Sequence, residues 1–121
     1  MILVPLWIHL SVFAYAADID TLVLYSESMK KNISTLIVIP HDHGKENRSN
    51  SAVMLLHGYG GNYLEWGEHA NLDSVADEFN FILFCPDGST NSWYLDSPVD
   101  LPSQYETYSI KELIPQLKVQ Y

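Results

Sequence analysis

The pattern of hydrophobic and polar residues along this chain predicts four β-strands. Thr21–Ser28 alternates and is rich in strand-forming residues, and Ile33–Ile39 continues in the same style until Pro40 closes it. Ala52–Leu56 and Phe81–Cys85 are short and wholly apolar. Short apolar runs suit the centre of a parallel sheet, where both faces of a strand are covered. We therefore expect two hairpin-forming strands followed by two central ones.

Helical spacing is present in two further segments. Leu72–Phe79 has apolar residues three and four positions apart, and Asn71 before it is a candidate N-cap. Tyr105–Tyr121 has the same spacing, and Pro115 inside this segment implies a kink. The apolar face of the second helix is predicted to hold Ile110, Leu113, Ile114 and Leu117.

The order of these elements predicts an α/β fold. Antiparallel strands at one edge would be followed by strand, helix, strand and helix, a succession that builds a parallel sheet. His41–Ser51 and Ser89–Gln104 are polar or proline-containing and are interpreted as loops. Because a parallel sheet normally continues with another strand after a helix, we expect residues 17–121 to form the N-terminal half of a domain.

The first sixteen residues have the character of a targeting segment. Met1–Ala16 contains no Asp, Glu, Lys or Arg and ends in Ala-Tyr-Ala, which fits a small-x-small cleavage site. The run is shorter than the roughly 20 residues that a membrane-spanning helix needs. We interpret it as a signal peptide and expect a secreted or periplasmic protein, without stable membrane insertion, whose mature chain starts at Ala17. The alternatives are a buried N-terminal strand and an uncleaved anchor.

Composition and charge narrow the classes of partner. Apolar residues make up 47% of the 121 residues, which is typical of a folded domain rather than a disordered chain. The formal net charge of -9 disfavours nucleic acid and anionic membranes as partners. Cys85 is the single cysteine and lies in an apolar run, so we predict a buried, inert thiol. His41 and His43 lie in a polar loop without a second ligand pair, so no metal site is expected.

The segment with the most chemical information is His57–Asn62, with the sequence His-Gly-Tyr-Gly-Gly-Asn, directly after the apolar run Ala52–Leu56. Glycine allows positive φ and leaves no Cβ in the way. A strand that ends in such a bend can leave backbone N–H groups unpaired and aimed at one point, where a developing negative charge can be held. We predict an oxyanion-hole loop here, with a tight strand-to-helix turn as the alternative.

A nucleophile for such a loop is absent from the 121 residues. In α/β-hydrolases the catalytic serine lies in Gly-x-Ser-x-Gly between a strand and a helix, and the acid and the histidine follow it. The pentapeptide does not occur here, and Gly88-Ser89-Thr90 lacks the first glycine. We therefore expect a chain truncated before its nucleophile elbow, which lacks the catalytic serine, acid and histidine and is inactive alone.

Several short motifs extend the oxyanion-type segment along the chain. They are Leu55–Asn62 with Trp66, Pro86–Gly88, Ser92–Pro98, Tyr105–Tyr108 and Lys111–Pro115. In this order and spacing they resemble the esterase branch of the α/β-hydrolases, which includes S-formylglutathione hydrolases, acetylxylan and feruloyl esterases, and the antigen 85 mycolyltransferases. The resemblance covers nearly all of the chain after the predicted signal peptide.

The resemblance implies roles for particular residues. It implies that the backbone N–H of Tyr59 donates to the oxyanion, with the N–H of Gly60 as the nearby alternative, and that the residue after the nucleophile supplies the second donor. It also implies acyl-serine chemistry, which needs no cofactor. From their residue types, Trp93 and Tyr94 are candidates to line the acyl or sugar side of a cleft or, equally, to pack beneath the loop as core.

The remaining carboxylates and His57 are expected to support the loops. Asp87 and Asp96 are predicted to accept backbone N–H bonds, and Glu106 to stabilise the start of the last helix. His57 is predicted to orient the glycine-rich loop by hydrogen bonding. None of the four is expected to act as the acid or base of a triad.

Three functional hypotheses follow. The first is part of a secreted serine ester hydrolase that acts on small-molecule or polysaccharide acyl esters, such as acetyl or feruloyl esters. The second is a non-catalytic glycan-binding module with an aromatic platform of Trp66, Trp93 and Tyr94. The third is an acyltransferase fragment. Because Ala52–Leu56 would lie at an open sheet edge in the isolated chain, we also expect that chain to self-associate.

Overall fold

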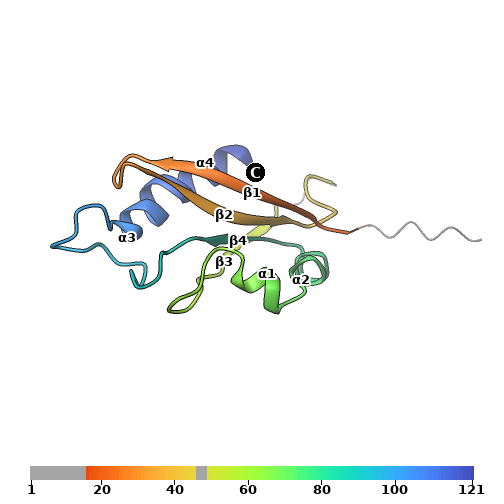
Figure 1. The fold of residues 1–121 in the computed structure, drawn as a ribbon. Coiled ribbons are helices and arrows are strands. Elements are labelled where there is room, and N and C mark those ends of the chain that lie inside the picture. Colours follow the sequence, from red (N-terminus) through yellow and green to blue (C-terminus); the bar gives the residue numbers. More distant parts are fainter. Residues whose placement is uncertain (1–15, 46–48) are drawn as a thin grey trace, which may run out of the picture.

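Four strands form one mixed sheet in the computed structural model, which describes residues 16–45 and 49–121 (Figure 1). Apart from Ala16, the predicted signal peptide lies outside the described residues. The strands are β1 (Asp18–Ser26), β2 (Lys31–Ile39), β3 (Ser51–Met54) and β4 (Phe81–Pro86), and their order in the sheet is β1-β2-β4-β3. β2 runs antiparallel to both β1 and β4, whereas β3 and β4 are parallel. The predicted combination of antiparallel edge strands and a parallel strand–helix–strand unit is confirmed.

Helices cover both faces of the sheet (Figure 1). Between β3 and β4 the chain forms α1 (Glu65–His69) and α2 (Leu72–Phe79), which lie on one face. After β4 it forms α3 (Tyr105–Thr107), a π-helical segment η1 (Tyr108–Leu113) and α4 (Ile114–Gln120), which lie on the other. In residues 16–45 and 49–121, none of the helices combines the length and the apolarity that crossing a bilayer requires.

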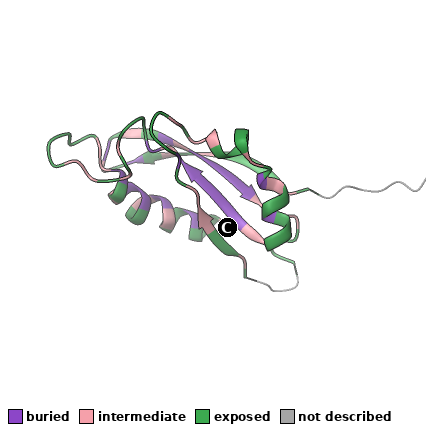
Figure 2. Ribbon diagram, turned by 90° about the horizontal axis from the view of Figure 1, so that it is seen from below, coloured by how far each residue is buried: buried purple, intermediate pink, exposed green. Residues whose placement is uncertain are grey.

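The two central strands, β2 and β4, are largely buried (Figure 2). Their side chains alternate between two apolar clusters. Because successive strand residues point to opposite faces, Ile37 and Phe84 contribute to the cluster under α3, η1 and α4. Leu36 and Leu83 contribute to the cluster under α1 and α2. Cys85 belongs to the second cluster, and burial raises the pKa of its thiol to about 11, as expected of an inert cysteine.

The C-terminal helical region differs from the prediction in the face that it buries. Tyr108 and Leu113 are both fully buried although they are five positions apart, a spacing that corresponds to the wider turn of η1. This wider turn leaves the side chain of Ile110 exposed to solvent, so its predicted place on the apolar face was wrong. Pro115 follows directly, near the start of α4. Since proline has no N–H and collides with the carbonyl four residues earlier, the wide turn lets the helix continue instead of ending.

β3 corrects a second expectation. The run Ala52–Leu56 was predicted as a strand buried on both faces, but the strand is Ser51–Met54, with Ser51 and Ala52 exposed. Among the described residues it pairs with β4 alone and therefore lies at an edge of the sheet. Within the apolar run, the side chains of Val53 and Leu55 pack against the cluster under α1 and α2.

Helix α2 has the predicted bounds, and the helix before it was not predicted. Asn71 holds the N-cap position of α2, but its side chain makes no capping hydrogen bond. Helix α1 has only five residues, so it presents too few turns for a periodic signal. Its position matters for the site because it starts with Glu65, directly after the glycine-rich loop.

Candidate active site

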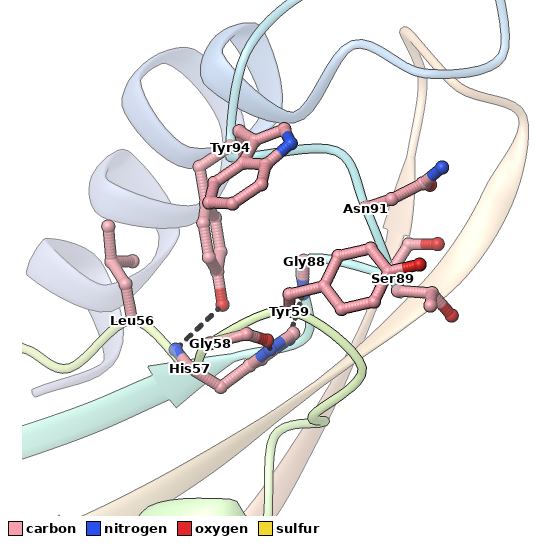
Figure 3. A pocket seen from close by; sticks show the side chains of 10 residues that line it. Leu56, His57, Gly58, Tyr59, Gly88, Ser89, Asn91 and Tyr94 are labelled. Carbon is pink, nitrogen blue, oxygen red and sulfur yellow. Dashed lines mark hydrogen bonds between the residues drawn. The ribbon is translucent and has the colours of Figure 1, made fainter.

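A pocket of about 230 Å³ opens where β3 and β4 end (Figure 3). Parallel strands end at the same edge of a sheet, which brings the loop after β3 against the loop after β4. The pocket lining consists of Leu56, His57, Gly58, Tyr59, Gly88, Ser89, Thr90, Asn91, Trp93 and Tyr94. The predicted oxyanion-type segment and the predicted aromatic pair, which are more than thirty residues apart in the sequence, therefore share one pocket.

His57 connects the two loops from the floor of this pocket. Its side chain is buried, and its Nδ1 lies 2.8 Å from the Gly58 carbonyl oxygen. Its Nε2 accepts a hydrogen bond of 2.8 Å from the N–H of Gly88. Since an accepting nitrogen carries no proton, the imidazole is neutral with its proton on Nδ1. Both nitrogens are occupied, so His57 orients the loop, as predicted, and is not placed to take a proton from a nucleophile.

The backbone N–H groups of residues 57–61 differ in whether they have a hydrogen-bond acceptor within the protein. Four of the five donate within the protein: His57 N to the Tyr94 hydroxyl at 3.2 Å, Gly58 N to Glu65 Oε2 at 3.2 Å, Gly60 N to the Thr90 carbonyl at 2.9 Å and Gly61 N to the Gly58 carbonyl at 3.1 Å. The N–H of Tyr59 has no acceptor among the described residues. Within residues 57–61 it is therefore the one N–H that remains available to a ligand.

The two candidate oxyanion donors are thereby distinguished. Gly60 has a φ of +77°, the left-handed conformation for which the sequence pattern needs a glycine, and its N–H is engaged by Thr90. Tyr59 combines an unengaged N–H with a side chain that is 72% exposed at the mouth of the pocket. Of the two residues, Tyr59 is the one whose N–H is free to donate to a ligand.

Trp93 and Tyr94 are adjacent in the sequence but have different environments. The Trp93 side chain is 72% exposed, and its ring lies 6.3 Å from the ring of Tyr59 with an angle of 30° between their planes. Tyr94 is half-buried, and its hydroxyl both accepts from His57 N and donates to the Pro86 carbonyl at 2.8 Å. Burial raises the pKa of Tyr94 well above its usual range. Trp93 therefore faces the pocket mouth, whereas the Tyr94 hydroxyl belongs to the framework of the site.

Trp66 of the binding-module hypothesis does not line the pocket with Trp93 and Tyr94. Trp66 lies in α1, and its indole N–H donates to the Leu56 carbonyl at 2.9 Å. It is not among the residues that line the pocket with Trp93 and Tyr94. The indole N–H of Trp66 instead anchors α1 to the segment that follows β3.

The carboxylates fix loops, as predicted. Asp87 Oδ1 accepts the N–H of Ser89 at 2.7 Å. Asp96 accepts two hydrogen bonds from Thr107, from its N–H at 2.9 Å and from its hydroxyl at 2.6 Å. These bonds hold the pKa of Asp96 below its usual value. Glu106 lies in the first turn of α3, where its charge is favourable.

Sequence reasoning missed the part played by Glu65. Its carboxylate reaches back seven residues to the N–H of Gly58, and Gly61 lies so close that a Cβ there would overlap the Glu65 carboxylate. A signal was present in the spacing, because a carboxylate that caps the loop must follow within one helical turn of Gly61. This spacing becomes recognisable only when α1 is known to begin at Glu65.

His41 and His43 lie away from the pocket and do not converge on a common point. His41 Nε2 is 2.8 Å from Lys45 Nζ, and His43 Nδ1 is 2.7 Å from Asn50 Oδ1. Within residues 16–45 and 49–121, no group of three or more His, Cys, Asp or Glu side chains is arranged to hold a metal ion.

Known proteins with the same fold and sequence pattern carry esterase names. Residues 26–121 match the family described as "Putative esterase", and the chain belongs to this family of carboxylic-ester hydrolases. An acetyl esterase from Caldicellulosiruptor saccharolyticus is 34% identical over 79 residues, a match that covers 60% of this chain and 29% of that protein.

Two solved structures show the same fold. A ferulic acid esterase superposes with a TM-score of 0.75 at 20% identity, over 90% of this chain and 44% of its own. An S-formylglutathione hydrolase from Agrobacterium tumefaciens superposes with a TM-score of 0.72 at 20% identity, over 89% of this chain and 45% of its own. The chain thus spans less than half the length of these relatives.

Proposed function

We propose that this chain supplies the oxyanion-binding part of a serine carboxylic-ester hydrolase that cleaves acyl esters. The observation that carries the proposal is the free N–H of Tyr59, a residue that lines the pocket, between N–H groups of Gly58 and Gly60 that are both engaged. Membership in the esterase family supports the reaction class. The predicted leader Met1–Ala16 supports export, which favours extracellular esters over cytosolic S-formylglutathione as substrates.

In the proposed reaction, a nucleophile attacks the ester carbonyl carbon and the carbonyl oxygen becomes an oxyanion. The Tyr59 N–H donates to that oxyanion, and a donor of this kind is typically worth about 2.7–4 kcal/mol in the transition state. The neutral His57 is committed to the loop, so the proton of the nucleophile goes to a different base. The Gly-x-Ser-x-Gly pentapeptide is not within the 121 residues, so assays use the complete gene product.

The first test is hydrolysis of p-nitrophenyl acetate by that product, with and without a serine-directed phosphonate. We expect hydrolysis that the phosphonate abolishes. The sequence downstream of the Tyr121 codon is read in parallel for a strand followed by Gly-x-Ser-x-Gly. A correctly folded product without hydrolysis would overturn the proposal.

A paired substitution tests the donor itself. Tyr59→Pro removes the N–H, and we expect kcat to fall about 10²- to 10³-fold, as for other single oxyanion donors. Tyr59→Ala removes the ring but keeps the N–H, so kcat should change far less. Circular dichroism establishes that both variants fold. Equal losses of kcat in the two variants would show that the N–H is not the donor.

The exposed ring of Trp93 supports an acyl or sugar contact. Aromatic faces suit planar acyl groups and sugar rings, and the Trp93 ring lies beside Tyr59 at the pocket mouth. We expect Trp93→Ala to raise KM for feruloyl esters more than for acetyl esters. Retention on a xylan column that Trp93→Ala abolishes, in a protein without hydrolysis, would favour the glycan-binding function. Product analysis with an alcohol acceptor separates hydrolysis from acyl transfer.

A further inference from the structure

The hydroxyl of Tyr94 ties the ends of two neighbouring strands together. It accepts the N–H of His57, which follows β3, at 3.2 Å. It donates to the carbonyl of Pro86, the last residue of β4, at 2.8 Å. Figure 3 shows this hydroxyl directed at the His57 backbone from the far side of the pocket. One oxygen atom from the loop after β4 therefore links the two strand ends.

A second link closes the arrangement into a cycle. The N–H of Gly88 donates to His57 Nε2 at 2.8 Å, so the loop after β4 also holds the imidazole. The rings of His57 and Tyr94 meet edge to face, with centroids 5.4 Å apart and planes at 63°. Since each loop is held by a group of the other, movement of either strand end would break at least one of these bonds.

The backbone around Tyr94 is shaped to bring its ring to this place. Trp93 and Tyr94 have φ values of 56° and 55°, a left-handed conformation that costs energy for residues with a Cβ. Ser92 Oγ supports the turn, because it donates to the Gly88 carbonyl and accepts from the Tyr94 N–H at 3.0 Å. Gly88 has no Cβ, and a Cβ there would overlap the Tyr94 ring. Several independent features thus converge on one side-chain position.

The free N–H of Tyr59 lies two residues beyond the His57 N–H that Tyr94 holds. The N–H groups of Gly58 and Gly60, on either side of Tyr59, are engaged by Glu65 and Thr90. Thr90 belongs to the same loop as Tyr94. The hydrogen bonds that hold the N–H groups of His57 and Gly60 therefore both depend on the position of that loop. The direction of the Tyr59 N–H is therefore determined by its neighbours, and Tyr94 holds the strand end from which the loop starts.

The geometry points to Tyr94 as a positioning residue that holds the Tyr59 N–H where the oxyanion forms. This inference rests on the proposed function. It differs from a substrate-binding role for the Tyr94 hydroxyl, because that hydroxyl has its donor and its acceptor within the protein. A positioning residue acts on the transition state and leaves ground-state binding of the ester unchanged.

Tyr94→Phe in the complete gene product tests this, because it removes the hydroxyl and keeps the ring. We expect kcat for p-nitrophenyl acetate to fall about tenfold or more with KM unchanged, since a small misplacement of a catalytic group has effects of this size. The affinity for a boronic acid, which mimics the tetrahedral intermediate, should fall by a similar factor. Tyr63→Phe is the matched control, because Tyr63 packs against the cluster under α1 and α2 outside the pocket.

Two results would overturn the inference. If Tyr94→Phe lowers the melting temperature but leaves kcat and boronic acid affinity unchanged, the hydroxyl is merely structural. If KM rises while kcat is constant, the hydroxyl contacts substrate. A variant that fails to fold is replaced by Gly88→Ala, whose new Cβ displaces the Tyr94 ring with its hydroxyl intact and should reproduce the selective loss of kcat.

A measurement that does not require activity separates this inference from the proposed function. The amide cross-peak of Tyr59 in a ¹H–¹⁵N spectrum reports the surroundings of that N–H. We expect it to move in Tyr94→Phe and to stay in place in Tyr63→Phe. A Tyr59 cross-peak that is unmoved in Tyr94→Phe refutes positioning. An inactive wild type whose cross-peak moves as expected refutes the ester hydrolase and leaves the positioning intact.

Discussion

The hydroxyls of Tyr94 and Tyr108 have opposite environments. At the loop end of the sheet, the Tyr94 hydroxyl accepts one hydrogen bond and donates another. Beneath the helices, Tyr108 is fully buried, and its hydroxyl lies near Thr35 Oγ1, but among the described residues neither group makes a hydrogen bond of ordinary geometry. The difference shows where precise polar pairing is concentrated: around the loop whose N–H is left free, rather than in the core that supports it.

The largest effect is expected from removing the side chain that joins the two loops. His57→Ala eliminates two hydrogen bonds and leaves the buried N–H of Gly88 without an acceptor. We expect the free energy of unfolding to fall by about 2–4 kcal/mol, measured by urea denaturation. The exposed His69 is the control, and His69→Ala should stay within about 0.5 kcal/mol of wild type. Equal losses in the two variants would mean that the pairing around His57 contributes nothing to stability.

A smaller effect is expected where the loop that carries Trp93 is attached to α3. Asp96→Ala removes both bonds to Thr107 and should lower the free energy of unfolding by about 1–2 kcal/mol. Asp100, which is exposed in the same loop, serves as the matched control. Chemical denaturation of the two variants side by side makes the comparison. A drop in Asp100→Ala as large as in Asp96→Ala would point to net charge instead of hydrogen bonding.

The core tyrosine should respond in the opposite direction. Tyr108→Phe removes a buried hydroxyl whose neighbour, Thr35 Oγ1, is not in ordinary hydrogen-bond geometry, so we expect the free energy of unfolding to rise by about 1 kcal/mol. Thermal denaturation checks the sign. A loss of stability would show instead that a buried water satisfies this hydroxyl.

The smallest effect is a dependence of stability on pH at Asp96. Hydrogen bonds from Thr107 lower the pKa of this carboxyl in the folded state. Stability from the charged carboxylate is therefore fully present above the unfolded pKa and is lost as pH falls through the folded one. Asp96→Asn should flatten the profile of unfolding free energy in this acidic range. The amplitude is small because solvent screens the carboxyl, and identical profiles for wild type and Asp96→Asn would contradict the assignment.

Much of the fold was predictable from local patterns. Leu72–Phe79 is helical over the predicted residues, and Phe81–Cys85 is a buried strand that extends one residue further, to Pro86. Both follow from hydrophobic periodicity, which depends only on near neighbours in the sequence. The outward position of Ile110 was not predictable in this way, because the wide turn before Pro115 changes which residues share a face.

The candidate site likewise combines a feature that the local sequence predicts with contacts that depend on distant residues. A strand followed by a glycine-rich bend is a local feature, and the resemblance to the esterase family implied Tyr59 and Gly60 as the oxyanion candidates within it. The distinction between them depends on Thr90, thirty residues away from Gly60, whose carbonyl occupies the Gly60 N–H. The sequence left Trp93 and Tyr94 open between cleft and core, and the structure assigns the first to the pocket mouth and the second largely to the framework.

Residue types and short-range spacing were thus sufficient for the α/β class, the central strands and the glycine-rich bend, because steric and hydrophobic preferences act within a few residues. Tertiary structure decided which N–H stays free and which side chains hold it. The bonds responsible join residues 31 and 37 positions apart, Gly88 to His57 and His57 to Tyr94. Such contacts form only when β3 and β4 lie side by side and end at the same edge of the sheet.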